Sequence, residues 1–421
     1  MGRTPRHAND RVAPLRVVIV HNQDFDPRSN ESDPFAGSRA DVQNTARDVE
    51  RALASRGHQV SMLPIADGGA QAALEAIRRL EADRPDLVFN LCESLAGDAR
   101  HEALLPALLD LAGIAYTGSG PQALGLALRK DLTKRLLRAA GVPTPEAVDP
   151  NGPNGPSRGE LPFPLIVKPT REDASVGISR YSVVHDRAQL ERQIDEIERT
   201  LGQPALVERY VEGRELYVSL IESPGQGPEP LPMHEVDFSD MPDDRPRIVS
   251  YEAKWQPSSL EYAGTRSVRA RPLAESVRQQ CEEVARAAFV ALELRDYARV
   301  DLRLAPDGQP YVIDVNPNCD LSDGAGVSRA ASFGGLSYPE LIERVCLAAL
   351  ARVSASRTES EPHARAPGNA TEAHVVDITR AAHPAAAAER SAGARGAGGE
   401  GRSLHQGGDL RRARADRRRA R

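Results

Sequence analysis

The stretch YARVDLRL at residues 297–304, followed by YVIDVNPN at residues 311–318, decides the fold. Each stretch alternates apolar and polar residues, which is typical of a β-strand with one buried face. Because Pro306-Asp307-Gly308 between them favours a tight turn, the two stretches predict a hairpin.

Polar residues share one face of each predicted strand. Arg299 and Asp301 stand two residues apart on the first, and Asp314 and Asn316 on the second. If the strands pair, two carboxylates, an amide and a guanidinium converge. Such oxygen ligands suit Mg²⁺, which usually takes one or two carboxylates and completes its shell with phosphate oxygens. A salt-bridged sheet face without a metal is the alternative interpretation.

Two further polar segments precede the hairpin. Lys168 ends an apolar run and leads into the small-residue loop Thr170–Ser179 (TREDASVGIS). Backbone N–H groups in such loops can cradle phosphate while a lysine neutralises it, although the spacing is not that of a Walker loop. Glu208 and Glu215 flank a glycine and could accept hydrogen bonds from a ribose or an adenine. Taken alone, these segments could equally be a surface loop and two solvated carboxylates.

Strands and helices alternate in the N-terminal third of the chain. Strands are predicted over residues 16–20, 60–63 and 87–90, and helices over residues 42–55, 72–80 and 103–112. This order predicts a parallel sheet with helices on both faces, and ligands at the loops 21–41 and 92–101. Farther on we expect helices over 124–140, 187–201 and 273–294, and strands over 165–169, 205–211 and 216–221.

The chain has 421 residues, which indicates two or three domains. Its apolar runs are far shorter than the roughly 20 residues of a membrane span, and the first residues carry no apolar signal-peptide core. The four cysteines form no Cys-x-x-Cys pair, which argues against a disulfide framework or a cysteine-zinc site. We therefore expect a cytoplasmic protein without a membrane partner.

Charge and lysine usage are uneven along the chain. The net charge is −6, although residues 352–421 hold 14 Arg against 8 Asp and Glu. The acidic body argues against general nucleic-acid binding, whereas the basic end of the tail leaves it open there. Only four of the 54 basic residues are lysines: Lys130, Lys134, Lys168 and Lys254. Because a lysine is a compact point charge that suits phosphate oxygens, these four positions are candidates for a function.

The order of these segments resembles the ATP-grasp superfamily and, within it, D-alanine–D-alanine ligase and its relatives. The resemblance covers about residues 15–350. Besides the hairpin, it is carried by VFN at 88–90, GIAYTGSG at 113–120, KDLTKRLLRAAGVPTP at 130–145, LIVKP at 165–169, SVGIS at 175–179, LVERYVEGRELYVSLI at 206–221 and SYEAKW at 250–255. It implies an α/β ATP-grasp fold.

The resemblance also implies a division of the chain. We expect a flexible N-terminus (1–14), a Rossmann-like parallel-sheet domain (15–125), a central lid subdomain (126–212), an α+β C-terminal subdomain (213–351) and a disordered tail (352–421).

Functional residues follow from the resemblance position by position. Lys134 and Lys168 match lysines that contact phosphate, and Lys254 matches one from a mobile loop. Ser175 lies in the phosphate loop, and Glu208 and Glu215 resemble the adenine and ribose contacts. Asp301, Asp314 and Asn316 match the ligands of Mg²⁺, of which two ions are expected beside ATP, although the family usually has Glu at position 314. Arg299 matches the arginine that stabilises an oxyanion, so Arg299, Lys254 and Lys168 are the candidate catalytic residues.

The segments that would bind amino acids depart from the family pattern. The family's Gly-Gly-x-Ser-x-Glu stretch is replaced by HNQDFDPRSNES, Ala174 and Trp255 replace a serine and a tyrosine, and Ala325 replaces a serine. We therefore expect an ATP-dependent carboxylate–amine ligase that acts through an acylphosphate on small substrates other than two D-alanines. We also expect a homodimer. The alternatives are a degenerate ATP-binding regulatory module and a ligase that modifies a peptide or protein.

Asp320 and Asp323 follow the hairpin in a segment that is small and neutral in D-alanine ligases. A carboxylate there would repel the free carboxylate of an acceptor, so we expect an acceptor with an extra positive charge or with a blocked carboxylate. Alternatively, Asp320 caps the following turn and does not meet a substrate.

Overall fold

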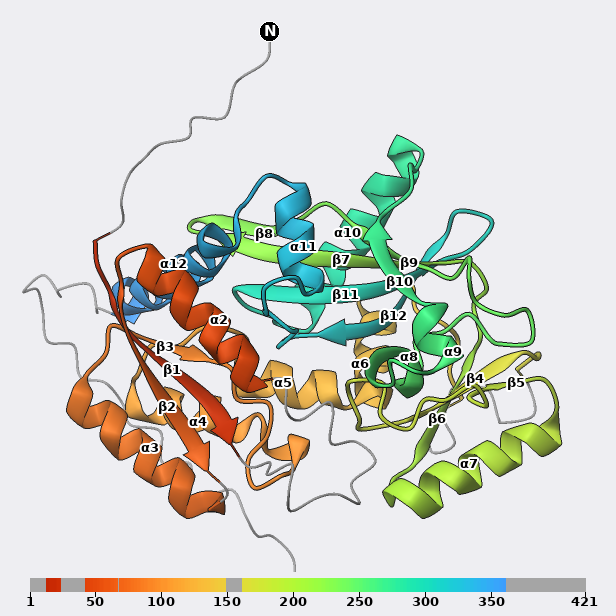
Figure 1. Cartoon of the computed structure of the whole chain (residues 1–421), viewed down its shortest axis with the longest axis horizontal. Helices are drawn as coiled ribbons and strands as arrows, with labels where there is room; N and C mark the ends of the chain where they lie inside the picture. The colour runs from red at the N-terminus through yellow and green to blue at the C-terminus, as the bar shows by residue number, and fades with distance from the viewer. Residues whose placement is uncertain (1–12, 24–41, 67, 149–160, 361–421) are drawn as a thin grey trace, which may run out of the picture. The chain divides into compact units, whose positions relative to one another are not determined.

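The computed structural model describes residues 13–23, 42–66, 68–148 and 161–360, with side chains up to residue 355. In this part of the chain, three β-sheets follow one another along the sequence (Figure 1). One is parallel, as the N-terminal alternation predicts, and two are antiparallel. The division of the chain into subdomains that the resemblance implies stays a prediction.

The parallel sheet has the strand order β2-β1-β3. It consists of β1 (Arg16–Gln23), β2 (Gln59–Ala66) and β3 (Leu87–Asn90), with α2 (Val42–Ser55), α3 (Gly69–Asp83) and α4 (Leu104–Ala112) beside them. One apolar cluster joins this sheet to α2, and another joins it to α3 and α4, so both faces are covered. The expected ligand loop 92–101 is described, and most of 21–41 lies outside the described residues.

The second sheet has the order β5-β4-β6 and carries one helix. Its elements are β4 (Leu165–Pro169), β5 (Val183–Val184), α7 (Arg187–Leu201) and β6 (Ala205–Arg209). The helix begins where Asp186 accepts a hydrogen bond from the Gln189 N–H and ends at Gly202, whose φ of 60° suits glycine. Leu190, Ile194 and Ile197 recur at helical spacing and pack α7 onto the sheet.

The third sheet runs β10-β9-β7-β11-β12, with β8 paired to β7. Its strands are β7 (Arg214–Ser223), β8 (Gln226–Pro230), β9 (His234–Asp237), β10 (Arg266–Arg269), β11 (Tyr297–Leu304) and β12 (Pro310–Asn316). Helices α8 (Tyr251–Trp255), α9 (Leu260–Ala263), α10 (Glu275–Ala291), α11 (Gly326–Phe333) and α12 (Tyr338–Ser360) complete this part. Because α10 covers one face of the sheet with apolar side chains, the other face is free to carry polar ones.

The single helix predicted over residues 124–140 is wrong, because the structure has two. They are α5 (Pro121–Leu128) and α6 (Lys130–Ala139), separated at Arg129, whose ψ of 82° is not helical. Outside the helix hydrogen-bond pattern, the Lys130 N–H donates to the Thr170 carbonyl at 3.0 Å. The break therefore links the start of α6 to the loop that follows β4.

The helix α12, which the sequence did not predict, reaches Ser360 and so enters the segment expected to be a disordered tail. Arg352 fixes it by an ion pair of 3.1 Å with Asp296 and a hydrogen bond to the Tyr116 carbonyl. The rest of that segment, and nearly all of residues 1–14, lie outside the described residues.

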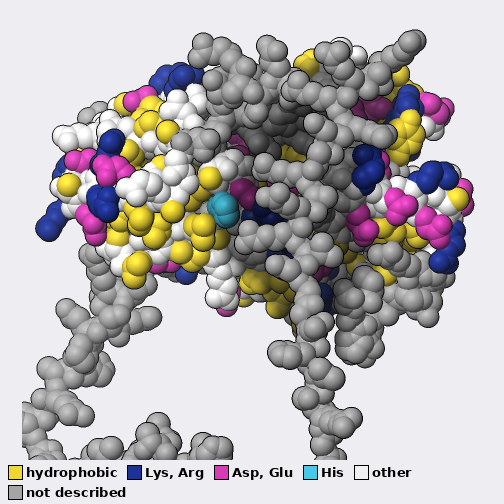
Figure 2. Space-filling model, turned by 90° about the horizontal axis from the view of Figure 1, so that it is seen from below, with side chains coloured by type: hydrophobic (Ala, Val, Ile, Leu, Met, Phe, Trp, Pro, Cys, Tyr) yellow, Lys and Arg dark blue, Asp and Glu magenta, His cyan; other side chains and the backbone are white. Residues whose placement is uncertain are grey.

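Hydrophobic side chains gather on the left of Figure 2, on the side of the parallel sheet and its helices. On α4, Leu104 is half exposed and Leu111 is 85% exposed. Among the helices that the structure describes, none has the length and apolar character that crossing a membrane requires. The homodimer expected from the sequence stays a prediction.

Candidate active site

The predicted hairpin is confirmed, and its register aligns the polar side chains. β11 and β12 are antiparallel, with Arg299 opposite Asn316 and Asp301 opposite Asp314. On the other side of β11, Asp301 lies opposite Tyr217 of β7. Since alternate residues of a strand share a face, the candidate metal ligands and Arg299 all stand on the sheet face that α10 leaves uncovered.

Arg299 and Asp301 form a two-point contact. Nε and Nη2 of Arg299 donate to the two oxygens of Asp301 at 2.6 and 2.9 Å. Asn316 Nδ2 donates to Asp301 Oδ2 at 3.3 Å. Nη1 of Arg299 has no hydrogen-bond partner among the described residues, so this donor is available to a ligand.

Lys130 contacts the second candidate metal ligand from α6. Its Nζ lies 3.0 Å from Asp314 Oδ1 and 3.2 Å from Asp173 Oδ1. Burial alone would lower the pKa of Lys130, but the two carboxylates outweigh it and raise that pKa. Burial acts in the opposite direction on Asp314, and Lys130, Lys168 and Lys134 together lower the pKa of this carboxyl. Asp314 is therefore ionised, as a metal ligand must be.

Lys134, Lys168 and Glu208 form a buried group of charges. Glu208, which is 0% exposed, lies 2.9 Å from Lys134 Nζ and 3.0 Å from Lys168 Nζ. Lys134 Nζ also donates to the carbonyl oxygens of Val312 and Ile313 at 2.9 and 3.2 Å. Burial would raise the pKa of Glu208, but the two lysines lower it, so the carboxylate stays charged.

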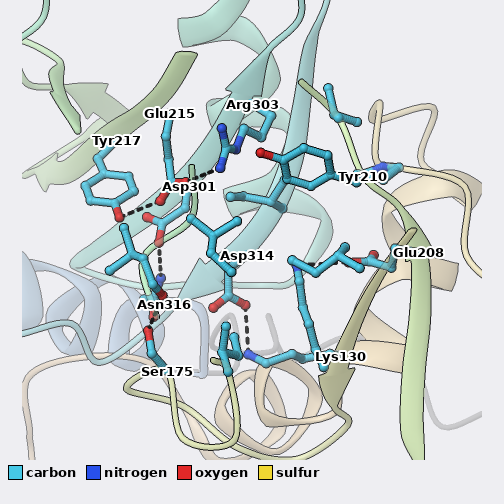
Figure 3. A pocket seen from close by; sticks show the side chains of 18 of the residues that line it. Lys130, Ser175, Glu208, Tyr210, Glu215, Tyr217, Asp301, Arg303, Asp314 and Asn316 are labelled. Atoms are coloured by element: carbon cyan, nitrogen blue, oxygen red, sulfur yellow. Dashed lines mark hydrogen bonds and ion pairs between the residues drawn. The ribbon is translucent and has the colours of Figure 1, made fainter. Parts of the chain in front are cut away.

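Glu215 is held from two sides. Its Oε2 lies 2.9 Å from Arg303 Nη2, and its Oε1 accepts a hydrogen bond from the Tyr217 hydroxyl at 2.8 Å. Figure 3 shows Glu215, Tyr217 and Arg303 along one side of the cavity, with Glu208 and Lys130 on the other. The expected ribose contact is thus supported by neighbours that the sequence did not suggest.

The predicted phosphate loop, Thr170–Ser179, is joined to α8 and to the segment before it. Ala174 and Ser175 have φ angles of 51° and 62°, which turn the loop sharply. Ser175 Oγ donates to the Val249 carbonyl at 2.9 Å, and Trp255 Nε1 donates to the Ala174 carbonyl at 3.0 Å. Ala174 and Trp255, two of the positions that depart from the family pattern, therefore contact each other.

Lys254 lies on α8 and faces the same cavity. Its ammonium has no ion-pair partner among the described residues and stands 5.7 Å from the Trp255 ring centre. The protein around it and the charge of Arg299 lower its pKa. A cation without an ion-pair partner beside a cavity attracts anions, so Lys254 stays a candidate for a phosphate contact.

One cavity of about 940 Å³, counting the part open to solvent, collects these side chains. All the predicted site residues line it except Lys134, which lies behind the wall formed by Glu208. The predicted site residues that line it are Lys168, Ser175, Glu208, Glu215, Lys254, Arg299, Asp301, Asp314 and Asn316.

The donor set suits Mg²⁺. Asp301 and Asp314 supply carboxylate oxygens. The amide oxygen of Asn316 stays available as a metal ligand, because the hydrogen bond to Asp301 uses the amide nitrogen. No cluster of three or more His, Cys, Asp or Glu that could hold a metal occurs in the part of the chain that the structure describes. Mg²⁺ needs none, because substrate phosphates and water complete its shell.

Sequence reasoning missed Tyr217 and Arg303 as lining residues. It singled out Lys130 as one of the four lysines but gave it no task of its own. Tyr217 could have been found from its position two residues after Glu215, on the same strand face. Arg303 likewise lies two residues after Asp301, on the same face of its strand.

Comparisons with known proteins agree with this architecture. The family model described as D-ala D-ala ligase C-terminus matches residues 155–346. The D-alanine–D-alanine ligase of a Synechococcus species is 31% identical, over 74% of this chain and 90% of that protein. The uncharacterized protein y4sG of Sinorhizobium fredii is 36% identical, over 79% of this chain and 96% of that protein.

A solved structure of D-alanine–D-alanine ligase from Bacillus anthracis, complexed with ATP, superposes with a TM-score of 0.60 at 19% identity. The superposition covers 81% of this chain and 99% of the Bacillus anthracis ligase chain, so the α/β ATP-grasp fold expected from the sequence is confirmed. Together with the sequence matches, this shows that the chain belongs to the D-alanine–D-alanine ligase-like family of ATP-grasp ligases.

Proposed function

We propose that this protein is an ATP-dependent ligase that joins a small carboxylate to an amine through an acylphosphate. The observation that carries the proposal is the meeting of Arg299, Lys254 and Lys168 with Asp301, Asp314 and Asn316 around one cavity. Cations positioned for the phosphates and for an oxyanion, facing acidic metal ligands, are what phosphoryl transfer followed by acyl transfer requires.

The bond changes are as follows. A substrate carboxylate oxygen attacks the γ-phosphorus of ATP, the bond from that phosphorus to the β–γ bridging oxygen breaks, and ADP leaves. The amine then attacks the acylphosphate carbon, phosphate leaves with the bonding electron pair, and the nitrogen loses a proton as the amide forms. Mg²⁺ held by Asp301, Asp314 and Asn316 would neutralise phosphate charge.

Each residue has a task in this sequence. Lys168 and Lys254 neutralise the phosphates, and Arg299 donates through its available Nη1 to the oxyanion on the acyl carbon. Glu215 accepts from the ribose. Glu208 and Ser175 complete the nucleotide side, and Lys134 acts on the nucleotide through Glu208.

The substrates differ, we propose, from two D-alanines. Ala174 and Trp255 stand where the family has a serine and a tyrosine. The hydrogen bond between them runs from the Trp255 indole N–H to the Ala174 backbone carbonyl, so it does not use the Ala174 side chain. Ala325, where a serine is expected, begins α11 without a side-chain cap. A degenerate regulatory module is less favoured, since nucleotide binding alone does not require Arg299.

The test is ADP release with pools of carboxylates and amines, with hydroxylamine added to trap the acylphosphate as a hydroxamate. ADP formation that depends on both substrates, with a hydroxamate in the absence of the amine, is the expected result. Arg299→Met should lower turnover by about 10²–10³-fold. Arg180→Met is the matched control, because Arg180 also stacks on a tyrosine but at the surface. Nucleotide binding without any ADP release across the pools would favour the regulatory module.

A further inference from the structure

The row of side chains that contains the metal ligands continues past them. Across four neighbouring strands, His234 lies opposite Tyr217, Tyr217 opposite Asp301, and Asp301 opposite Asp314. The proposed reaction uses Asp301 and Asp314 but assigns nothing to Tyr217 or His234. Both side chains are therefore candidates for a further role.

The ring of Tyr217 packs against the guanidinium of Arg299. The Arg299 guanidinium carbon stands 4.7 Å from the centre of the Tyr217 ring, a distance at which a cation is attracted by an aromatic face. Asp301 holds the Nε and Nη2 side of the same guanidinium. The ring and the carboxylate together restrict the plane of Arg299 and keep Nη1 in place.

His234 holds the Tyr217 ring in turn. The two rings meet edge to face, with centres 5.0 Å apart and planes at 81°. His234 is 1% exposed, and its Nδ1 has no hydrogen-bond partner in the described part of the chain. Burial and the charges of Arg299 and Arg329 lower the pKa of His234 to about 3. The imidazole is therefore neutral and does not repel Arg299 across the tyrosine.

The hydroxyl of Tyr217 reaches the nucleotide side. It donates to Glu215 Oε1 at 2.8 Å, while Arg303 takes the other oxygen of that carboxylate. One side chain thus touches the proposed ribose acceptor with its hydroxyl and the proposed oxyanion donor with its ring. In Figure 3 Tyr217 stands beside Glu215 and near Asp301, at the edge of the cavity.

We propose that Tyr217 is a positioning residue that orients Arg299 through its ring and Glu215 through its hydroxyl, with His234 fixing the ring. The task of Arg299 in this statement rests on the proposed function. The alternative is that Tyr217 and His234 only fill space on the sheet. Space filling predicts a loss when the ring volume is removed and none when only the hydroxyl is removed, whereas positioning predicts a separate loss for each.

Three variants separate these roles. Tyr217→Phe keeps the ring and removes the hydroxyl, Tyr217→Leu removes both, and Tyr181→Leu is the matched control. Arg180 stands 4.6 Å from the Tyr181 ring, almost the distance in the Arg299 pair, but Tyr181 is 61% exposed. The control therefore loses an arginine–tyrosine stack away from the cavity.

Two measurements need no turnover. The first is the affinity for a non-hydrolysable ATP analogue in the presence of Mg²⁺, which should fall about five- to tenfold in both Tyr217 variants and stay unchanged in Tyr181→Leu. The second is the Nε–H resonance of Arg299, assigned by its loss in Arg299→Lys. The ring current of Tyr217 should displace this signal in the parent and in Tyr217→Phe, and the displacement should vanish in Tyr217→Leu.

Turnover provides the third measurement. In Tyr217→Leu we expect kcat to fall about 10–100-fold beyond the change in Tyr217→Phe, because a misplaced Arg299 loses its alignment with the oxyanion. An unchanged affinity in Tyr217→Phe, or an Arg299 resonance that is the same in the Phe and Leu variants, would overturn the proposal. If no substrate pool gives turnover even in the parent, the proposed function fails, while the resonance and the affinity still decide whether Tyr217 positions Arg299 and Glu215.

Discussion

The two sides of the cavity handle charge differently. On the nucleotide side, Lys134, Lys168 and Glu208 pair with one another inside the protein. On the reaction side, Lys254 has no ion-pair partner in the described segments, and Arg299 keeps one donor available. Charges that satisfy each other contribute to folding, whereas charges that lack a partner are available to a ligand. Substitutions on the first side should therefore affect stability first, and those on the second should affect turnover first.

The largest expected effect tests the closed group of charges. Glu208→Gln would leave Lys134 and Lys168 buried without their carboxylate, which should lower the free energy of unfolding by about 3–5 kcal/mol. Chemical denaturation of the apo protein measures it. Glu191→Gln is the control, since Glu191 pairs with Arg187 at the surface and should change stability by less than about 1 kcal/mol. If both variants lost less than about 1 kcal/mol of unfolding free energy, the buried group of charges would not contribute to folding as the comparison states.

Lys168 lies where the two sides meet, because it pairs with Glu208 and lines the cavity. Lys168→Ala should reduce turnover by about 10²–10³-fold through lost stabilisation of phosphate charge. The fold should persist, since Lys134 still neutralises Glu208. Initial rates of ADP release with the melting temperature provide the measurement. Turnover close to that of the parent would remove Lys168 from the mechanism.

The pH dependence of the unfolding free energy tests the burial of Lys134 on the first side of the cavity. Burial lowers its pKa to about 8, and the nearby Glu208 only partly offsets this. Between about pH 8 and the ordinary lysine value of 10.5, the unfolded chain keeps a proton that the folded protein has released. The unfolding free energy of the parent, relative to Lys134→Met, should therefore rise with pH across this window. A fall or a flat difference would show that Lys134 remains protonated.

The smallest expected effect concerns Asp320. Its Oδ1 accepts a hydrogen bond from the Ser322 N–H at 2.8 Å, so it caps the turn, and its charge also opposes the lowering of the Lys254 pKa. Asp320→Asn keeps an oxygen for the cap and removes the charge. Because an exposed charge pair contributes about 0.2–1 kcal/mol, kcat/KM for a cationic acceptor should fall no more than about fivefold. Efficient use of plain D-alanine by the parent, with no change in the variant, would leave Asp320 as a cap only.

The sequence predicted what depends on strand alternation. Arg299, Asp301, Asp314 and Asn316 were assigned to one face from their spacing alone, and the register of β11 and β12 brings them together. The parallel sheet followed from the order of strands and helices for a similar reason, since local periodicity determines both.

Contacts between distant segments were beyond reach. The break at Arg129 depends on a hydrogen bond from Lys130 to Thr170, and the position of Lys134 behind Glu208 depends on how α6 meets β6. The contacts of Tyr217 could not be predicted because its neighbours, His234 and Arg299, come from other strands. Such pairings are set by tertiary packing, which one sequence does not display.

The bond between Trp255 and Ala174 has a practical consequence. The chain contains one tryptophan, so the intrinsic fluorescence excited at the red edge of the absorption band comes from this side chain alone. Its indole N–H bonds the phosphate loop, and the Lys254 ammonium stands 5.7 Å from its ring. Any movement of α8 against that loop changes the surroundings of the fluorophore. The unlabelled protein therefore carries an optical probe at the junction where nucleotide and substrate would meet.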